Sequence, residues 1–418
     1  MICNPPTTLV LKASLLALAV TLTLAGCSTQ PPVTPERPVA LSDEALLDQG
    51  IRYAVDDLIA QALRAPAFQP APPPAALNAL LKSPPKVDKT LVLLDRAVDG
   101  VTGQETGATR EIDRRTLEQL TAGLPDHTVS AVAPQNSGKG QFLVTSTLSP
   151  VGNAGGRNFV IKMSLTDLRS GIVIANAAAR VRANGVDETP TQFFRESPAV
   201  SRDRTTDGQI RTAGTSAGAQ ADALYISHLP IAALITEGEK RYEQGECKGA
   251  VQYFEEAAAR PEGQLLKVFN GLYLCQTQLD RTQAAETTFA RIVALGLATN
   301  NLSVKFLFNP GSVDFIADPK ISTAYTMWLR QIAKEAVAAR ACMSVIGHSS
   351  RTGSEQVNAR LSQQRALTVQ RRLEAMAPEL TGRMQSVGMG FRENLVGSGT
   401  DDLRDALDRR VEFKVRPC

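Results

Sequence analysis

Polar residues near the C-terminal end of the chain have types and spacing suited to binding a small charged ligand. The segment Gly347 to Gly353 follows a short apolar run, and backbone N–H groups in such a turn before a helix favour an anion. Asn358, Leu361 and Arg365 come three or four positions apart, so they share one helical face. The alternative for this face is a solvated basic stripe that also includes Arg371 and Arg372.

These residues require a sheet and helices to position them. The apolar pattern predicts an opening strand at 304–308, with Ser312 in the turn after it, a helix from about residue 319 to 339 and a central strand at 341–346. Gly388 and Gly390 lie further along, and Asp408 to Phe413 reads as a closing strand.

Together these segments resemble the OmpA-like peptidoglycan-binding domain over residues 301–418. The family motifs G-H-T-D-x-x-G, N-x-x-L-S-x-x-R-A, G-x-G and N-R-R-V-E have counterparts here in that order. The resemblance implies helices packed on one mixed sheet, an α/β sandwich, and a ligand that is the diaminopimelate part of the wall's stem peptide. It gives Arg365 the ligand carboxylate, which a planar guanidinium binds through two parallel hydrogen bonds. The residues it implies for peptidoglycan binding are Gly347, Ser350, Gly353, Asn358, Leu361, Arg365, Asp405, Asp408, Arg409 and Arg410.

Two departures from the family pattern concern charge. Ser350 stands where the family has the aspartate expected to hold the ligand ammonium, and Asp408 stands where it has asparagine. Asp405 replaces the usual arginine three positions earlier. We hypothesise that Asp405 or Asp408 restores the lost negative charge; the alternative is a reduced wall affinity or an altered ligand. His348, at a strand end, is expected to be packed rather than a metal ligand.

The first residues predict export and lipidation. Lys12 precedes the apolar run 13–24, which is too short to span a membrane, and Leu24-Ala25-Gly26-Cys27 resembles the bacterial lipobox. This resemblance implies that 1–26 is a signal peptide, that Cys27 is the lipid anchor and, with Ser28 after it, that the chain lies at the periplasmic face of the outer membrane. The alternative is an ordinary secretory signal with a chance cysteine. A proline-rich tether follows over 27–40.

Four of the six cysteines remain in the mature chain. An even number in an oxidising compartment predicts disulfides, and three connectivities exist. We prefer Cys247 with Cys275 and Cys342 with Cys418, because each pair lies inside one predicted module.

Residues 41–185 predict an α+β domain. A leading amphipathic helix is followed by a buried strand at 90–95, a helix at about 111–120 and three strands at 141–148, 158–167 and 172–181. This order, with the phrase Met163 to Gly171, resembles LpoB-type activators of penicillin-binding proteins. The alternative is an α+β domain of unrelated role.

The middle of the chain predicts a linker and helices. Residues 186–230 are rich in small and polar types, which predicts a flexible linker. Ser216 lies in a G-x-S-x-G sequence, but no strand and helix flank it as a nucleophile elbow needs. Residues 231–298 resemble tetratricopeptide repeats. Their role is a partner-binding groove or a helical spacer.

Composition limits the function classes. The 418 residues carry a net charge of only +3, which disfavours nucleic-acid binding, and three histidines exclude a histidine-rich metal cluster. We find no supported nucleophile, metal site or catalytic carboxylate pair, so no enzymatic activity and no cofactor are predicted. The expected fold is multidomain α+β. The expected function is an outer-membrane lipoprotein that binds peptidoglycan non-covalently, tethers the membrane to the wall and holds a periplasmic protein partner; the alternative is a regulator that activates a penicillin-binding synthase.

Overall fold

The computed structural model describes residues 45–69, 89–152, 158–309, 311–395, 399 and 408–418. The expectations for the signal segment 1–26, Cys27, the tether 27–40 and Asp405 therefore lie outside the described residues. In the part of the chain that is described, no helix is both long and apolar enough to cross a membrane. The predicted α+β fold is confirmed, with two mixed sheets and a group of helices between them in the chain order.

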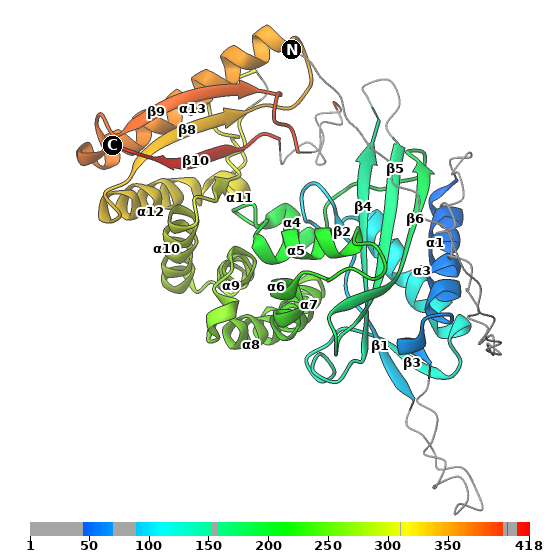
Figure 1. The fold of residues 1–418 in the computed structure, drawn as a ribbon. Coiled ribbons are helices and arrows are strands. Elements are labelled where there is room, and N and C mark those ends of the chain that lie inside the picture. The colour runs from blue at the N-terminus through cyan, green and yellow to red at the C-terminus, as the bar shows by residue number, and fades with distance from the viewer. Residues whose placement is uncertain (1–44, 70–88, 153–157, 310, 396–398, 400–407) are drawn as a thin grey trace, which may run out of the picture. The chain divides into compact units, whose positions relative to one another are not determined.

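The N-terminal part is a mixed sheet whose strands are β1 (Thr90–Leu94), β2 (Val98–Asp99), β3 (His127–Ala131), β4 (Phe142–Val151), β5 (Asn158–Asp167) and β6 (Ile172–Arg182). Their order is β3-β1-β4-β5-β6, with β2 beside β4. Strand β1 runs parallel to β3 and β4, whereas β4, β5 and β6 form the expected antiparallel meander. Helices α1 (Leu47–Ala62) and α3 (Gly107–Gly123) lie together on one face of this sheet (Figure 1).

Both faces of this sheet are buried. Val92 and Leu94 of β1 belong to the core beneath α1 and α3. Leu93 points to the opposite face, because side chains alternate along a strand, and there it clusters with Tyr225 and Leu229. The second cover comes from helices α5 (Arg204–Ala213) and α6 (Ala223–Ser227), which follow the domain in sequence.

The prediction of a flexible linker over residues 186–230 is wrong. This segment forms α4 (Gln192–Glu196), α5 and α6, and Phe193 and Phe194 are completely buried. Phe193 stacks on Phe254 of the following helices, with ring centroids 6.0 Å apart. The polar residues that indicated a linker instead cap helices, as when the Asp203 carboxylate accepts the Thr206 N–H.

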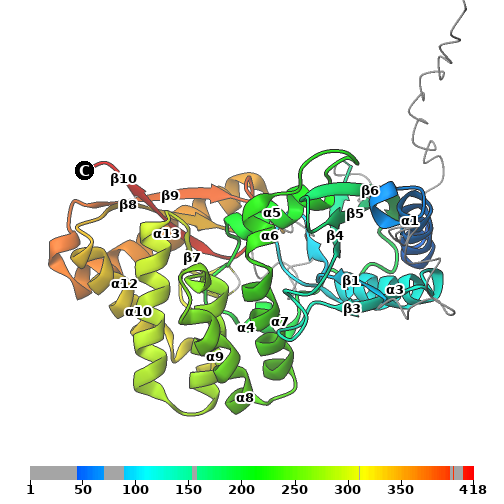
Figure 2. The ribbon, with the colours of Figure 1, turned by 60° about the horizontal axis from the view of Figure 1, so that its bottom comes forward.

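Four helices form the middle part: α7 (Leu229–Glu243), α8 (Cys247–Ala258), α9 (Leu266–Gln278) and α10 (Thr282–Ala298). Figure 2 shows them side by side. Close packing depends on glycine, because a Cβ atom at Gly238 would lie 2.8 Å from the Phe254 ring. The likeness to tetratricopeptide repeats and the role of the segment stay predictions.

The C-terminal part has the strands β7 (Leu302–Val304), β8 (Cys342–His348), β9 (Met384–Gly390) and β10 (Val411–Arg416). Their order is β7-β10-β8-β9, with β8 and β9 parallel and β10 antiparallel to both of its neighbours. Its helices are α11 (Pro319–Ser322), α12 (Tyr325–Ala338) and α13 (Glu355–Met376). The expected single helix over 319–339 is thus two helices, and the opening strand begins and ends earlier than the predicted 304–308.

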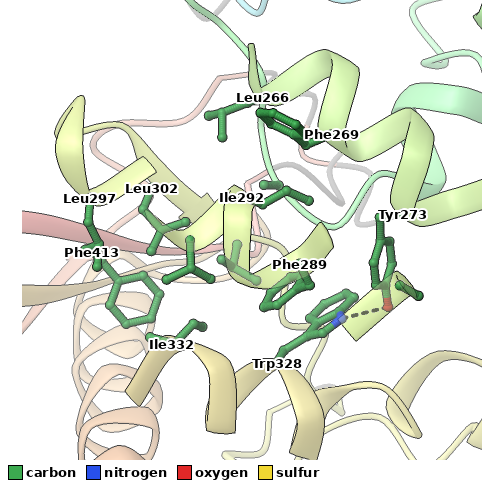
Figure 3. Close-up of a cluster of buried hydrophobic side chains, with 14 of the residues drawn as sticks. Leu266, Phe269, Tyr273, Phe289, Ile292, Leu297, Leu302, Trp328, Ile332 and Phe413 are labelled. Carbon is green, nitrogen blue, oxygen red and sulfur yellow. Dashed lines mark hydrogen bonds between the residues drawn. The ribbon is translucent and has the colours of Figure 1, made fainter. Parts of the chain in front are cut away.

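One hydrophobic core joins the helical part to the C-terminal part (Figure 3). Phe289 of α10 stacks on Trp328 of α12, with ring centroids 5.2 Å apart. The Trp328 indole N–H donates to the Tyr273 hydroxyl at 2.8 Å, and the Glu286 carboxylate accepts from Arg330 at 2.7 Å. These contacts pack α12 directly on α9 and α10, so the helical part and the C-terminal part are not separated by a linker.

We predict that Phe289→Ala destabilises both parts at once. Truncating a buried phenylalanine costs about 3–5 kcal/mol of unfolding free energy. Hydrogen exchange should therefore speed up in both α10 and α12. The control is Met376→Ala in α13, where the side chain is 42% exposed, and it should leave exchange in α10 unchanged. Faster exchange confined to α10 would contradict the shared core.

Candidate functional site

Helix α13 carries the predicted ligand-binding face. Its N-terminus is capped by the Ser354 hydroxyl, which accepts the Val357 N–H. Asn358, Ser362 and Arg365 are buried on the side that faces the sheet, whereas Leu361 is half-buried. The predicted helical face therefore exists, but it packs inward, unlike the alternative of a solvated stripe. Only Arg371 and Arg372 of that stripe are exposed.

The Arg365 guanidinium holds the loop that follows Phe308. Its Nε donates to the Ser312 carbonyl at 3.1 Å and its Nη2 to the Asn309 carbonyl at 3.2 Å. The guanidinium carbon lies 4.8 Å from the centroid of the Phe308 ring, within the range of a cation–π contact. Arg365 is only 4% exposed, so this loop covers it.

Glycines let α13 lie directly on β8 and β9. A Cβ at Gly347 would collide with the Ser362 carbonyl oxygen, and one at Gly388 would lie 2.5 Å from the Gln363 nitrogen. The Ser362 hydroxyl in turn accepts the Gly390 N–H at 2.8 Å. The G-x-G pattern thus marks close approach of a helix to a strand.

The turn after β8 is fixed by Asn358. Its side-chain amide donates to the Thr352 carbonyl at 2.8 Å and to the Ser354 carbonyl at 3.2 Å. Gly353 has φ of +92°, a conformation that favours glycine. Ser350, at the position of the family's aspartate, is 7% exposed. The turn is therefore held by side-chain to backbone bonds.

The predicted motif segments meet at one end of the C-terminal sheet. The Ser349 N–H after β8 donates to the Gly390 carbonyl at the end of β9 at 2.9 Å, and the His348 N–H donates to the Arg410 carbonyl before β10 at 3.0 Å. Together with the bond from Gly390 to Ser362, these contacts bring all four motifs together.

Asp408 is fully buried beside this end of the sheet. Its carboxylate accepts the Leu395 N–H at 2.6 Å, so it holds the segment after β9. Arg409, its neighbour, is half-buried. Asp405, the other candidate for charge compensation, lies outside the described residues.

An ionic group lies behind the motif histidine. Arg410, 3% exposed, donates from Nε to the Glu412 carboxylate at 2.8 Å and from Nη2 to the Glu393 carbonyl at 3.2 Å. The His348 Nε2 lies 3.7 Å from the same Glu412 carboxylate. Burial, and then the Arg410 charge, lower the pKa of His348 to about 4. Burial alone would raise the pKa of Glu412, but Arg410 and His348 bring it below its usual value.

Residue types alone missed several hydrogen-bond partners at this site. Asn309, Glu393 and Leu395 take part through backbone groups, which leave no mark in the side-chain pattern. Glu412 could have been found, because its carboxylate closely follows the motif residue Arg410 in the sequence. Among the described residues, no group of three or more His, Cys, Asp or Glu side chains is arranged to hold a metal ion.

One predicted disulfide is present and the other is not. Cys342 and Cys418 are joined, with Cα atoms 5.2 Å apart, and so link the start of β8 to the segment after β10. Cys247 and Cys275 are both buried free thiols, which corrects the predicted bridge. The Cys247 thiol donates to the Gln278 side-chain oxygen at 2.8 Å, so its polar group is satisfied without a disulfide.

Comparison with known proteins identifies part of the chain. Residues 307–406 match the OmpA family, which confirms the predicted C-terminal module over that range; Asp408, Arg409 and Arg410 lie just beyond it. The chain is similar to the peptidoglycan-associated lipoprotein from Burkholderia pseudomallei, at 23% identity and a TM-score of 0.23, over 27% of this chain and 89% of that one. It is also similar to the cell wall anchor of the T6SS from Pseudomonas aeruginosa, at 24% identity and a TM-score of 0.23, over 27% and 78% of the two chains. No curated protein sequence matches the chain.

We predict a pH-dependent stability that His348 causes. Its pKa falls from 6.5 in the unfolded chain to about 4 in the folded one, so this contribution is present above about pH 6.5 and is lost as the pH falls toward 4. The loss amounts to about 3 kcal/mol of unfolding free energy. When the unfolding free energy is measured by urea denaturation at several pH values in this range, it should change less steeply with pH in His348→Gln than in the unsubstituted chain. Equal slopes would mean that His348 does not cause it.

Proposed function

Because residues 307–406 form a domain of the OmpA family, we propose that this chain binds peptidoglycan non-covalently and tethers the outer membrane to it. The observation that carries the proposal is the convergence of the four motif segments, one of which carries the buried Arg365, at one end of the C-terminal sheet. The ligand of this site is the stem peptide with its diaminopimelate residue. The membrane end of the tether is a lipid on Cys27.

Arg365 is the proposed receptor of the ligand carboxylate. In the present structure its guanidinium bonds to the backbone carbonyls of Asn309 and Ser312. A charged carboxylate is a stronger acceptor than a neutral carbonyl, and it accepts two parallel bonds from a guanidinium. Wall binding would therefore exchange the loop carbonyls for the ligand, and Arg365 positions the loop until then.

The ligand ammonium needs a negatively charged partner, and the Ser350 hydroxyl, which replaces the family's aspartate, carries no charge. Asp405 and Asp408 remain our proposal for this compensation. Asp408 sits where the motifs meet, although its carboxylate is buried and holds the Leu395 N–H. Its contribution would then act through the field of a buried charge, which is strong at low dielectric.

We predict that Arg365→Ala lowers the fraction of protein that sediments with purified walls by about tenfold or more, because a charge-assisted bidentate contact is lost. Arg365→Lys should recover little, since an ammonium lacks the planar pair of donors. The control is Arg371→Ala on the exposed side of the same helix, which should sediment like the unsubstituted chain.

The same assay tests charge compensation. Asp405→Ala and Asp408→Ala should each weaken sedimentation as much as Arg365→Ala does. Asp408→Asn separates charge from packing, because the amide keeps an acceptor for the Leu395 N–H. Undiminished sedimentation of the aspartate variants would show that no such compensation occurs.

The membrane end has a separate test. Cys27→Ser removes the thiol that would carry lipid, so we predict that the variant moves from the membrane fraction to the soluble periplasmic fraction while still sedimenting with purified walls. Membrane retention of the variant after high-salt washing would contradict the anchor without touching the wall-binding proposal.

The fold constrains how the N-terminal and helical parts could hold a protein partner or, in the alternative function, activate a synthase. The sheet face that contains Leu93 and Leu143 is already covered by Tyr225 and Leu229 of the same chain. A fragment that ends near residue 185 would uncover this face. Any binding or activation assay should therefore use the full chain.

A further inference from the structure

A polar cavity lies where β1 ends against the helical part of the chain. It has a volume of about 50 Å³, room for a few water molecules or one small polar group. Asp95 and Arg96 enter it directly after β1, Glu105 enters it just before α3, and Glu239 enters it from α7. The carboxyl ends of parallel strands are where open sheets commonly bind ligands, and β1 runs parallel to both of its neighbours.

Three of the acidic groups in and around this cavity have internal partners. Asp95 accepts the Tyr225 hydroxyl at 2.5 Å, and Glu105 accepts from the Arg96 guanidinium at 2.5 Å. Asp203, at the rim, caps α5 through the Thr206 N–H at 2.8 Å. These carboxylates are accounted for by the fold itself.

Glu239 has no such partner for one of its oxygens. The residue is 2% exposed, and among the described residues its Oε1 has no hydrogen-bond partner. Leaving a buried carboxyl oxygen unpaired costs free energy, so a site of this kind calls for a donor. Burial raises the pKa of Glu239 to about 8, a shift that nearby Lys267 and Arg96 oppose and Glu105 favours.

Lys267 does not fill this role. Its ammonium lies 5.2 Å from the centroid of the Phe194 ring, in a cation–π contact. Its side chain lines the cavity, yet within the described residues it makes no hydrogen bond to the Glu239 Oε1. Within the described residues, Oε1 of Glu239 therefore stays available to a donor from outside the chain.

A wider groove adjoins the cavity. It has a volume of about 590 Å³, and it shares Asp203, Thr205, His228 and Leu265 with the cavity lining. Leu224, Leu266 and Leu295 make much of its wall apolar. An apolar groove next to a polar cavity suits a ligand with a short apolar stem and a charged tip, since the stem would lie in the groove and the tip would enter the cavity.

We propose that this cavity binds a primary alkylammonium group, which donates to the Glu239 carboxylate while its alkyl stem lies against Leu265 and Ile235. The lining favours a cation, because it has four acidic side chains against the two basic ones of Arg96 and Lys267, and the ionised form of Glu239 adds to the negative charge. A metal ion is disfavoured, because the described residues offer no cluster of three ligating side chains. The ammonium is that of a free amine or of a lysine side chain on a peptide.

Binding should be coupled to proton release. A neutral Glu239 must ionise to accept the ammonium, so affinity rises with pH up to about pH 8 and then levels off. The other titratable or charged groups that face Glu239, or line the cavity around it, are Asp95, Arg96, Glu105, Asp203, Tyr225, His228, Glu243 and Lys267.

The test is isothermal titration calorimetry of the full chain with n-butylamine, with n-butanol as the uncharged control. We expect saturable binding of the amine alone, at least about tenfold tighter at pH 8 than at pH 6. Titrations in buffers of different ionisation enthalpy should show one proton released at pH 7. This measurement needs no variant, so it stands even if a substitution impairs folding.

Glu239→Gln keeps the shape of the neutral side chain and removes its ability to ionise. It should bind n-butylamine at least about tenfold more weakly at pH 8 and without pH dependence. The matched control is Glu237→Gln on the same helix, because the Glu237 carboxylate pairs with Arg241 instead, and the affinity of this variant for n-butylamine should be unchanged.

A blocked tripeptide with a central lysine distinguishes a peptide from a free amine as the source of the ammonium. Binding tighter than that of n-butylamine assigns the groove to a peptide, and weaker binding assigns it to a free amine. Equal binding of amine and butanol, or an unaffected Glu239→Gln, would overturn the proposal.

Discussion

The burial of Phe193 and Phe194 is the interaction on which the packing of the helical part against the C-terminal part depends. Phe193 packs on Phe254 of the helical part. The Phe194 carbonyl accepts a hydrogen bond at 2.6 Å from the ammonium of Lys305, which belongs to the C-terminal part. Lys305 is only 8% exposed, and this burial lowers the pKa of its ammonium to about 7. Residues that lie between two predicted modules in the sequence therefore belong to a shared core.

Much of the fold could be predicted from the sequence because its signals are local. The apolar runs of β1, β4, β5 and β6 and the periodicity of α1 lie within single elements. The prediction of a linker over residues 186–230 failed because it relied on the abundance of Thr, Ser and Asp and gave too little importance to the few large apolar residues there. A better signal was the continuous run Leu91 to Leu94, since a strand apolar at successive positions is buried on both faces and needs a second cover.

The site shows the same division. Sequence motifs identified Arg365, Asn358 and the glycines, and the structure brings these motifs together. The partners of Arg365 could not be predicted, because they are backbone carbonyls whose position depends on the course of a loop. The environment of Glu239 could not be predicted for a related reason. It arises only when residues more than a hundred positions apart in the sequence meet at one cavity.

The pairing of Val200 with Ser303 has a consequence for how the C-terminal sheet meets other proteins. The Val200 N–H donates to the Ser303 carbonyl, and the Lys305 N–H donates to the Pro198 carbonyl, so this short stretch occupies the outer side of β7. An uncovered edge strand offers a template for pairing with another chain and for aggregation. The segment before the helices thus acts as a built-in guard against edge-to-edge association, and a C-terminal fragment that begins after it would have lost that protection.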